Sequence, residues 1–145
     1  MKANQIAQIR SFNRFYTSVI GLLDKHYLNS EFSLAEVRIL YEMYHQPGGI
    51  TASTLIELLN LDKGYLSRIL LRLEKKKLIK KRKSVHDRRS FYLCLSPHGK
   101  NIFEKLNAAS QEQAIQLLLP LRHSETVKLI DHMEAIRQIL KNADI

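Results

Sequence analysis

Hydrophobic residues recur at spacings of three and four over most of the chain, which predicts a mainly helical protein. The spacing predicts helices at residues 4–28, between Ser33 and Pro47, after Thr51, at 63–76, from Pro97 to about 119, and around 127–140. Proline cannot continue a helix and paired glycines favour a turn, so Pro47-Gly48-Gly49 and Pro120 are natural ends.

Polar residues that cap helices stand at the predicted starts. Ser33 and Glu36 form a capping-box pattern, Thr51 and Asp62 precede the third and fourth helices, and Ser96-Pro97 begins the fifth. The residues expected to face inward from the second, third and fourth helices are Val37, Leu40, Tyr41 and Tyr44; Leu55, Leu58 and Leu59; and Leu66, Ile69, Leu70 and Leu73.

The periodicity changes to two after Leu78-Ile79. Residues 80–84 read as an extended polar segment, and residues 91–95 alternate in the manner of a strand. The basic loop between them makes a hairpin. The fold class is therefore mainly α with a small β-hairpin wing: a winged helix-turn-helix lobe at 33–96 within a single domain, 1–145.

The helices outside this lobe, at 1–28 and 97–145, carry apolar stripes too long for so small a core to cover. Association of two chains through these helices is the simplest way to bury them. We therefore expect a homodimer with N- and C-terminal dimerisation helices.

Charge is concentrated in one segment. The formal net charge is +9, and residues 61–100 hold thirteen basic and three acidic residues, a net +10, so that the other 105 residues sum to −1. Such a field suits a polyanion, nucleic acid before an acidic membrane surface. A solvated basic face is the alternative that composition leaves open.

The helix at 63–76 is expected to read DNA. Its outward residues are Lys63, Ser67, Arg68, Arg72 and Lys75, and Tyr65 can add a backbone or thymine-methyl contact. A helix fits the major groove of B-DNA, where arginine pairs with the edge of guanine. Phosphate neutralisation is assigned to Lys75, Lys76, Lys80, Lys81, Arg82 and Lys83. An amphipathic helix with a merely solvated basic face is the other interpretation.

The hairpin loop favours the DNA interpretation. Arg88 and Arg89 repel each other and do nothing for folding, whereas a narrow minor groove would attract both. Asp87 either orients an arginine or caps the turn.

These segments together resemble the MarR family of bacterial winged-helix transcriptional regulators. The family's wing pattern is Asp-x-Arg, closing with Leu-x-Leu-Thr and a glycine three residues later. Asp87, Arg89, Leu93, Leu95 and Gly99 match it, with Ser96 in place of the threonine. The resemblance extends in order and spacing over essentially the whole chain.

The resemblance implies a homodimer that acts on a pseudo-palindromic operator, and repression is the expected effect. It implies a recognition helix in each major groove and Arg89, with Arg88 nearby, in each minor groove. The chain departs from the family at Lys77, where glycine is frequent. A left-handed residue there costs a non-glycine side chain about 1 kcal/mol, so the connection after this helix can differ from that of the family.

Family members also bind small aromatic effectors between the DNA-binding lobe and the dimerisation helices. The candidates here are Phe12, Phe15, Tyr16, Tyr41, Tyr44 and His45. Plain core packing is the competing interpretation for each of them. Cys94, the single cysteine, is expected to be an ordinary strand residue, and the scattered histidines predict no metal site.

Other functions find little support. The sequence has no nucleophile–base pair, phosphate loop or metal cluster, so we expect neither an enzyme nor a cofactor. It has no apolar run long enough to span a membrane and no signal peptide, so a cytoplasmic protein is expected. A winged-helix module that binds an acidic protein partner remains the alternative.

Overall fold

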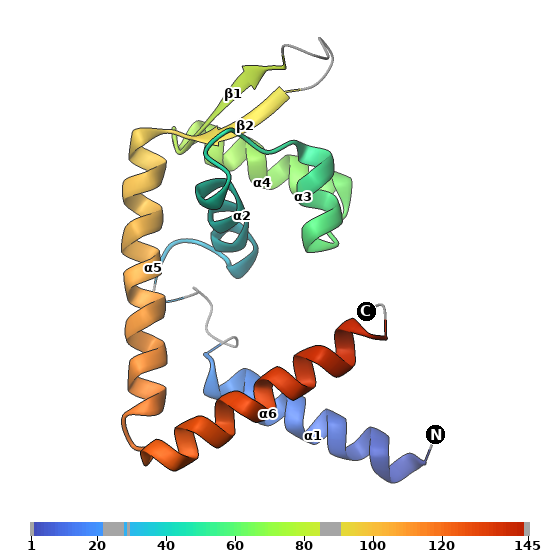
Figure 1. The fold of residues 1–145 in the computed structure, drawn as a ribbon. Helices are drawn as coiled ribbons and strands as arrows, with labels where there is room; N and C mark the ends of the chain where they lie inside the picture. The colour runs from blue at the N-terminus through green and yellow to red at the C-terminus, as the bar shows by residue number, and fades with distance from the viewer. Residues whose placement is uncertain (1, 22–27, 29, 85–90, 144–145) are drawn as a thin grey trace. The chain divides into compact units, whose positions relative to one another are not determined.

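The computed structural model describes residues 2–21, 28, 30–84 and 91–143. The chain divides into two compact units, Met1–Ser110 and Gln111–Ile145, and helix α5 runs across their boundary. Figure 1 shows the elements. In chain order they are α1 (Ala3–Val19), α2 (Leu34–His45), α3 (Ala52–Leu59), α4 (Lys63–Lys75), β1 (Ile79–Lys83), β2 (Phe91–Leu95), α5 (Pro97–Leu118) and α6 (His123–Lys141). The predicted mainly helical fold with a two-stranded hairpin is confirmed.

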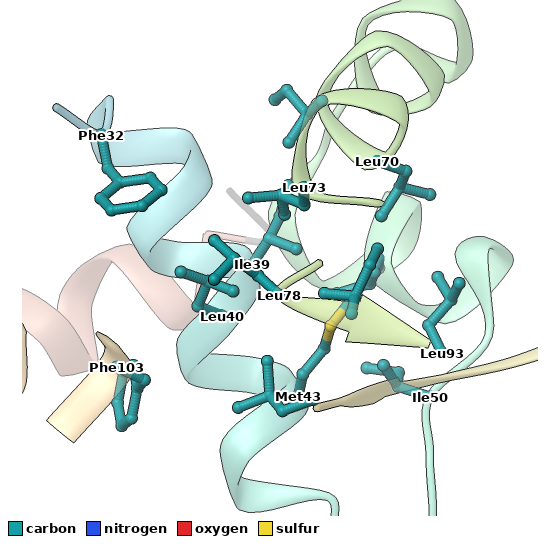
Figure 2. Packing of buried hydrophobic residues seen from close by; sticks show 14 of the residues in the cluster. Phe32, Ile39, Leu40, Met43, Ile50, Leu70, Leu73, Leu78, Leu93 and Phe103 are labelled. Carbon is teal, nitrogen blue, oxygen red and sulfur yellow. The ribbon is translucent and has the colours of Figure 1, made fainter. Parts of the chain in front are cut away.

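The hydrophobic core lies in the first unit, where α2, α3, α4, the hairpin and the start of α5 meet. Figure 2 shows side chains from these elements converging, among them Leu40, Leu73, Leu78 and Phe103. All four residues predicted to face inward from α4, which are Leu66, Ile69, Leu70 and Leu73, are buried. Their burial fixes which face of α4 points to solvent.

The predicted helix caps are present. The side chains of Ser33, Thr51 and Asp62 accept hydrogen bonds from the backbone N–H groups of Glu36, Thr54 and Tyr65, at 3.3, 3.2 and 2.8 Å. Each bond satisfies a backbone donor that the first turn of a helix leaves without a partner.

Helix α4 ends in a left-handed turn at Lys77, whose φ is +58°. The Lys77 N–H donates to the carbonyl of Glu74, and the Leu78 N–H donates to the carbonyl of Leu73, at 2.8 and 3.0 Å. These two bonds define a Schellman motif, with Leu73 and Leu78 both in the core. The connection therefore keeps the geometry that glycine favours, although a lysine occupies the position.

The hairpin is antiparallel, with Ile79 opposite Leu95 and Lys83 opposite Phe91. Ile50 adds a short bridge to Leu93 on the other edge of β2, through hydrogen bonds of 3.0 and 2.8 Å. This bridge joins the segment before α3 to the wing.

Ser96 connects the end of α4 to the start of α5. Its hydroxyl donates to the carbonyl of Lys77 at 2.7 Å and accepts from the N–H of Gly99 at 2.9 Å. A β-carbon on Gly99 would lie only 2.0 Å from the carbonyl oxygen of Leu78. Gly99 is therefore required by close approach of two backbones, and not by an unusual φ.

Three details of the predicted helices are wrong. The first helix ends at Val19, with Gly21 left-handed at φ +66°, and residues 22–27 lie outside the described part of the chain. In α2 the buried residues are Glu36, Ile39, Leu40 and Met43, whereas Tyr41 and Tyr44 are exposed. Leu58 is exposed as well. Short helices leave the edge of their apolar face ambiguous, and packing decides it.

The terminal helices keep large apolar side chains at their surfaces. Neither α1 nor α6 contains a buried residue. The exposed apolar residues of these helices and of the segment 115–119 are Ile6, Ile9, Phe12, Phe15, Val19, Ile115, Leu117, Leu119, Val127, Ile130, Met133, Ile136, Ile139 and Leu140. None of the helices in the described part of the chain is both long and apolar enough to cross a bilayer.

Candidate nucleic-acid interface

Helix α4 presents a basic face to solvent, opposite its buried leucines and isoleucine. The predicted contact residues Lys63, Tyr65, Ser67, Arg68, Arg72 and Lys75 are all exposed. Asp62 holds the first turn through its bond to the Tyr65 N–H. The buried face thus fixes the rotation of α4 about its axis, and the cap fixes the residue at which the helix begins. The basic residues therefore have a defined orientation toward solvent.

Arg72 has a partner within the lobe that the sequence did not reveal. Its Nε lies 3.2 Å from Oε1 of Glu36, on α2. The Glu36 side chain is 8% exposed, and its Oε2 accepts from the Ser33 N–H at 2.8 Å and from the Ser33 hydroxyl at 3.0 Å. Arg72 therefore ties α4 to the start of α2, while its side chain remains 55% exposed.

Several other cations of the basic segment are also paired. Lys81 Nζ lies 3.0 Å from the carboxylate of Glu74, Lys76 pairs with Glu31, and the Arg82 guanidinium donates to the carbonyl of Gly48. The exposed cations Lys63, Arg68, Lys75, Lys80 and Lys83 form no ion pair with any residue that the structure describes. These five cations lie on α4 and along β1.

Leu71 stands out on this face, and it was not among the contact residues predicted from the sequence. At about 100° per residue, the direction opposite the buried side chains of α4 runs through Gly64, Arg68, Leu71 and Lys75. Leu71 is 55% exposed at the middle of that line. The helical period of α4 alone could have revealed it, because Leu71 lies outside the apolar face.

The predicted wing-tip residues cannot be placed in this way. Asp87, Arg88 and Arg89 lie outside the described residues, which stop at Ser84 and resume at Phe91. Their roles remain predictions.

The predicted effector residues fall into two groups. Tyr41, Tyr44 and His45 gather around Phe103 of α5, with the ring centroids of Tyr44 and Phe103 4.5 Å apart. The Tyr44 hydroxyl donates to Glu104 at 3.3 Å. On α1, Phe12 stacks on Tyr16 at 5.7 Å, and Phe15 is exposed. The ring contacts in the described residues do not join the two groups.

A small cavity lies elsewhere in the same unit. Its volume is about 180 Å³, and it is lined by Glu31, Phe32, Lys76, Leu78, His98 and Ile102. None of the six predicted effector residues lines it. Among the described residues, no group of three or more histidine, cysteine, aspartate or glutamate side chains could hold a metal ion.

The fold and the basic helix define a winged helix-turn-helix protein of the type found in transcriptional regulators. The sequence model of the MarR family matches residues 30–90, the segment that carries α2 to the wing. The winged-helix part of this chain is therefore a MarR-family domain, and the resemblance seen in the sequence is confirmed.

Solved structures extend the likeness of fold to the rest of the chain. A mutant of MarR from E. coli, complexed with operator DNA, is 22% identical with a TM-score of 0.73, over 92% of this chain and 95% of that one. PcaV, a transcriptional regulator from Streptomyces coelicolor, is 18% identical with a TM-score of 0.72, over 98% and 99%. FabT from Streptococcus pneumoniae, in complex with DNA, is 19% identical with a TM-score of 0.70, over 96% and 95%. Comparison with curated proteins gives no significant match.

Proposed function

We propose that this protein is a sequence-specific DNA-binding transcriptional regulator that represses its target as a homodimer. The observation that carries the proposal is the outward face of α4, where Lys63, Arg68 and Lys75 have no ionic partner among the described residues. Two structures with the same fold are complexes with DNA. A helix with free cations, held by a buried opposite face, suits the major groove.

In this proposal Lys63, Ser67, Arg68 and Arg72 contact the major groove. The cations of β1 and the last turn of α4 neutralise phosphates. Arg88 and Arg89 enter the adjacent minor groove, and Asp87 orients one of them. The lobe at 33–96 carries all of these contacts, and the helices outside it carry association.

The exposed apolar faces of α1 and α6 support a dimer. These helices bury none of their own residues, and their large hydrophobic side chains recur along each of them. A second copy of the same chain supplies a matching apolar face through a two-fold axis. The dimer then sets two recognition helices on half-sites about one helical turn apart, which favours a pseudo-palindromic operator.

The aromatic group around Phe103 supports regulation by a small aromatic effector. Tyr41 and Tyr44 are 38% and 36% exposed, so that part of each aromatic side chain can still contact a small ligand. An effector there would contact α2, and α2 is joined to α4 through Glu36 and Arg72.

Selection of bound fragments from a genomic library tests the proposal directly. The full chain should bind random duplex at low salt, and selected fragments much more tightly at about 0.15 M salt, where nonspecific binding is weakened. Absence of binding to any duplex at low salt would refute DNA binding and favour a module for an acidic protein partner.

A further inference from the structure

The outermost side chain at the centre of the recognition helix is apolar. Leu71 is 55% exposed, whereas Leu66, Leu70 and Leu73 of the same helix are buried. It lies between Arg68 and Lys75 on the line opposite the core, so it is not part of the buried face of α4. Its exposed apolar surface is available for contact with something outside the lobe.

Arg68 leaves Leu71 uncovered. One of its guanidinium nitrogens lies 3.7 Å from the point where a β-carbon on Gly64 would stand. The Arg68 side chain therefore extends toward the start of α4, across the glycine, as side chains on helices generally lean. Gly64 adds no bulk there, so a DNA surface can come close to both Arg68 and Leu71.

Charge around Leu71 selects the kind of partner. The flanking Arg68 and Lys75 have no ion pair with described residues, and the segment 61–100 has a net charge of +10. An apolar group surrounded by free cations suits a surface that is anionic but offers isolated apolar groups. The major groove is such a surface, because the C5-methyl of thymine is its apolar group.

We propose that Leu71 is a specificity-determining residue that packs against the C5-methyl group of a thymine in each half-site. This inference rests on the proposed function and deepens it. The axial rise from Arg68 to Leu71 is about 4.5 Å, which lies between one and two base-pair steps of about 3.4 Å. The thymine therefore lies within about two base pairs of the guanine contacted by Arg68.

Deoxyuridine provides the test, since it differs from thymidine only by the missing methyl group. A consensus duplex is first selected with the wild-type chain from a random library. Each thymine of one half-site is then replaced in turn by deoxyuridine, and Kd is measured by fluorescence anisotropy. At one position, we expect binding to weaken about four-fold, which corresponds to about 0.8 kcal/mol for one buried methyl group.

Protein variants then assign that methyl contact. The Leu71→Ala variant should bind thymine and deoxyuridine duplexes equally, whereas wild type discriminates. Leu58→Ala is the matched control, because Leu58 is 54% exposed but lies on α3. It should keep the four-fold discrimination. Circular dichroism melting confirms that both variants fold, as expected for exposed positions.

The outcomes separate the two proposals. If wild type selects a consensus but tolerates deoxyuridine everywhere, or if Leu71→Ala keeps the discrimination, Leu71 does not read thymine and DNA binding stands. If wild type binds no duplex at low salt, the proposed function fails and this inference fails with it.

Discussion

The guanidinium Nε of Arg72 lies 3.2 Å from Oε1 of Glu36, and this ion pair joins α4 to the capped start of α2. The carboxylate is almost fully buried and also accepts two bonds from Ser33. An arginine chosen from the sequence as a DNA contact therefore also holds two helices of the lobe together.

This ion pair should give a measurable coupling free energy between Arg72 and Glu36 in a double-mutant cycle. Arg72→Ala leaves a buried carboxylate with Ser33 as its remaining partner, so we expect the free energy of unfolding to fall by about 1–2 kcal/mol. Urea unfolding of Arg72→Ala, Glu36→Gln and the double variant gives the interaction energy. A value below about 0.3 kcal/mol would show that the pair contributes nothing beyond its separate residues.

Gly99 should tolerate no side chain. A β-carbon there would overlap the carbonyl oxygen of Leu78, so Gly99→Ala must displace the start of α5 or the end of the Schellman turn. We expect a loss of about 3 kcal/mol or more in thermal or urea unfolding. Gly48→Ala is the control, since nothing lies within 4 Å of its β-carbon position. A similar loss in both variants would contradict the close-approach explanation.

Replacement of Lys77 by glycine should stabilise the fold. Its left-handed φ of +58° is strained for lysine, so Lys77→Gly should raise the free energy of unfolding by about 0.5–1 kcal/mol. Lys75→Gly removes the same charge from a helical position and should lower it by about the same amount. The relief of strain would be disproved if the two variants lost equal stability.

Arg68 and Lys81 should affect DNA binding differently. Arg68→Ala is expected to reduce the difference in binding free energy between specific and random duplex by about 1–3 kcal/mol, because a guanine contact is lost. Lys81→Ala should weaken both kinds of binding alike, because a cation near phosphate carries no base information. Footprinting on one selected operator compares them, and equal losses on specific and random duplex from Arg68→Ala would refute this division.

A single charge on α6 should break the proposed dimer. Ile136 is an exposed member of the apolar face of α6, so Ile136→Glu should shift the chain to monomers by burying a carboxylate in the interface. Ala135→Glu adds the same charge about 100° around the helix and should stay dimeric. Sedimentation velocity measures the two species. Monomers for wild type, or dimers for both variants, would exclude this face.

The parts of the fold that sequence could predict are local. Ser33, Thr51 and Asp62 cap the helices that immediately follow them, so a window of about four residues contains all the information. The inward face of α4 was also predictable, because four apolar residues lie on one side of this thirteen-residue helix. Tyr41 and Leu58 were misassigned, since aromatic and leucine residues at the edge of an amphipathic face can lie on either side.

The parts that sequence could not predict depend on contacts between distant segments. Glu36 and Arg72 meet only when α2 packs on α4, and no short motif links them. The reason for Gly99 is likewise the carbonyl of Leu78, on the far side of the hairpin. Leu71 was visible in the helical period, but its meaning required knowing that Arg68 leans away from it.

The hydroxyl of Ser96 limits which amino acids can occupy that position. This hydroxyl donates a hydrogen bond to the carbonyl of Lys77 and accepts one from the N–H of Gly99. Threonine, which the family pattern has at this position, can make both hydrogen bonds through its hydroxyl. Alanine and valine can make neither. Substitution at this junction is thus confined to two residue types, although the side chain there is buried and distant in sequence from the basic face of α4.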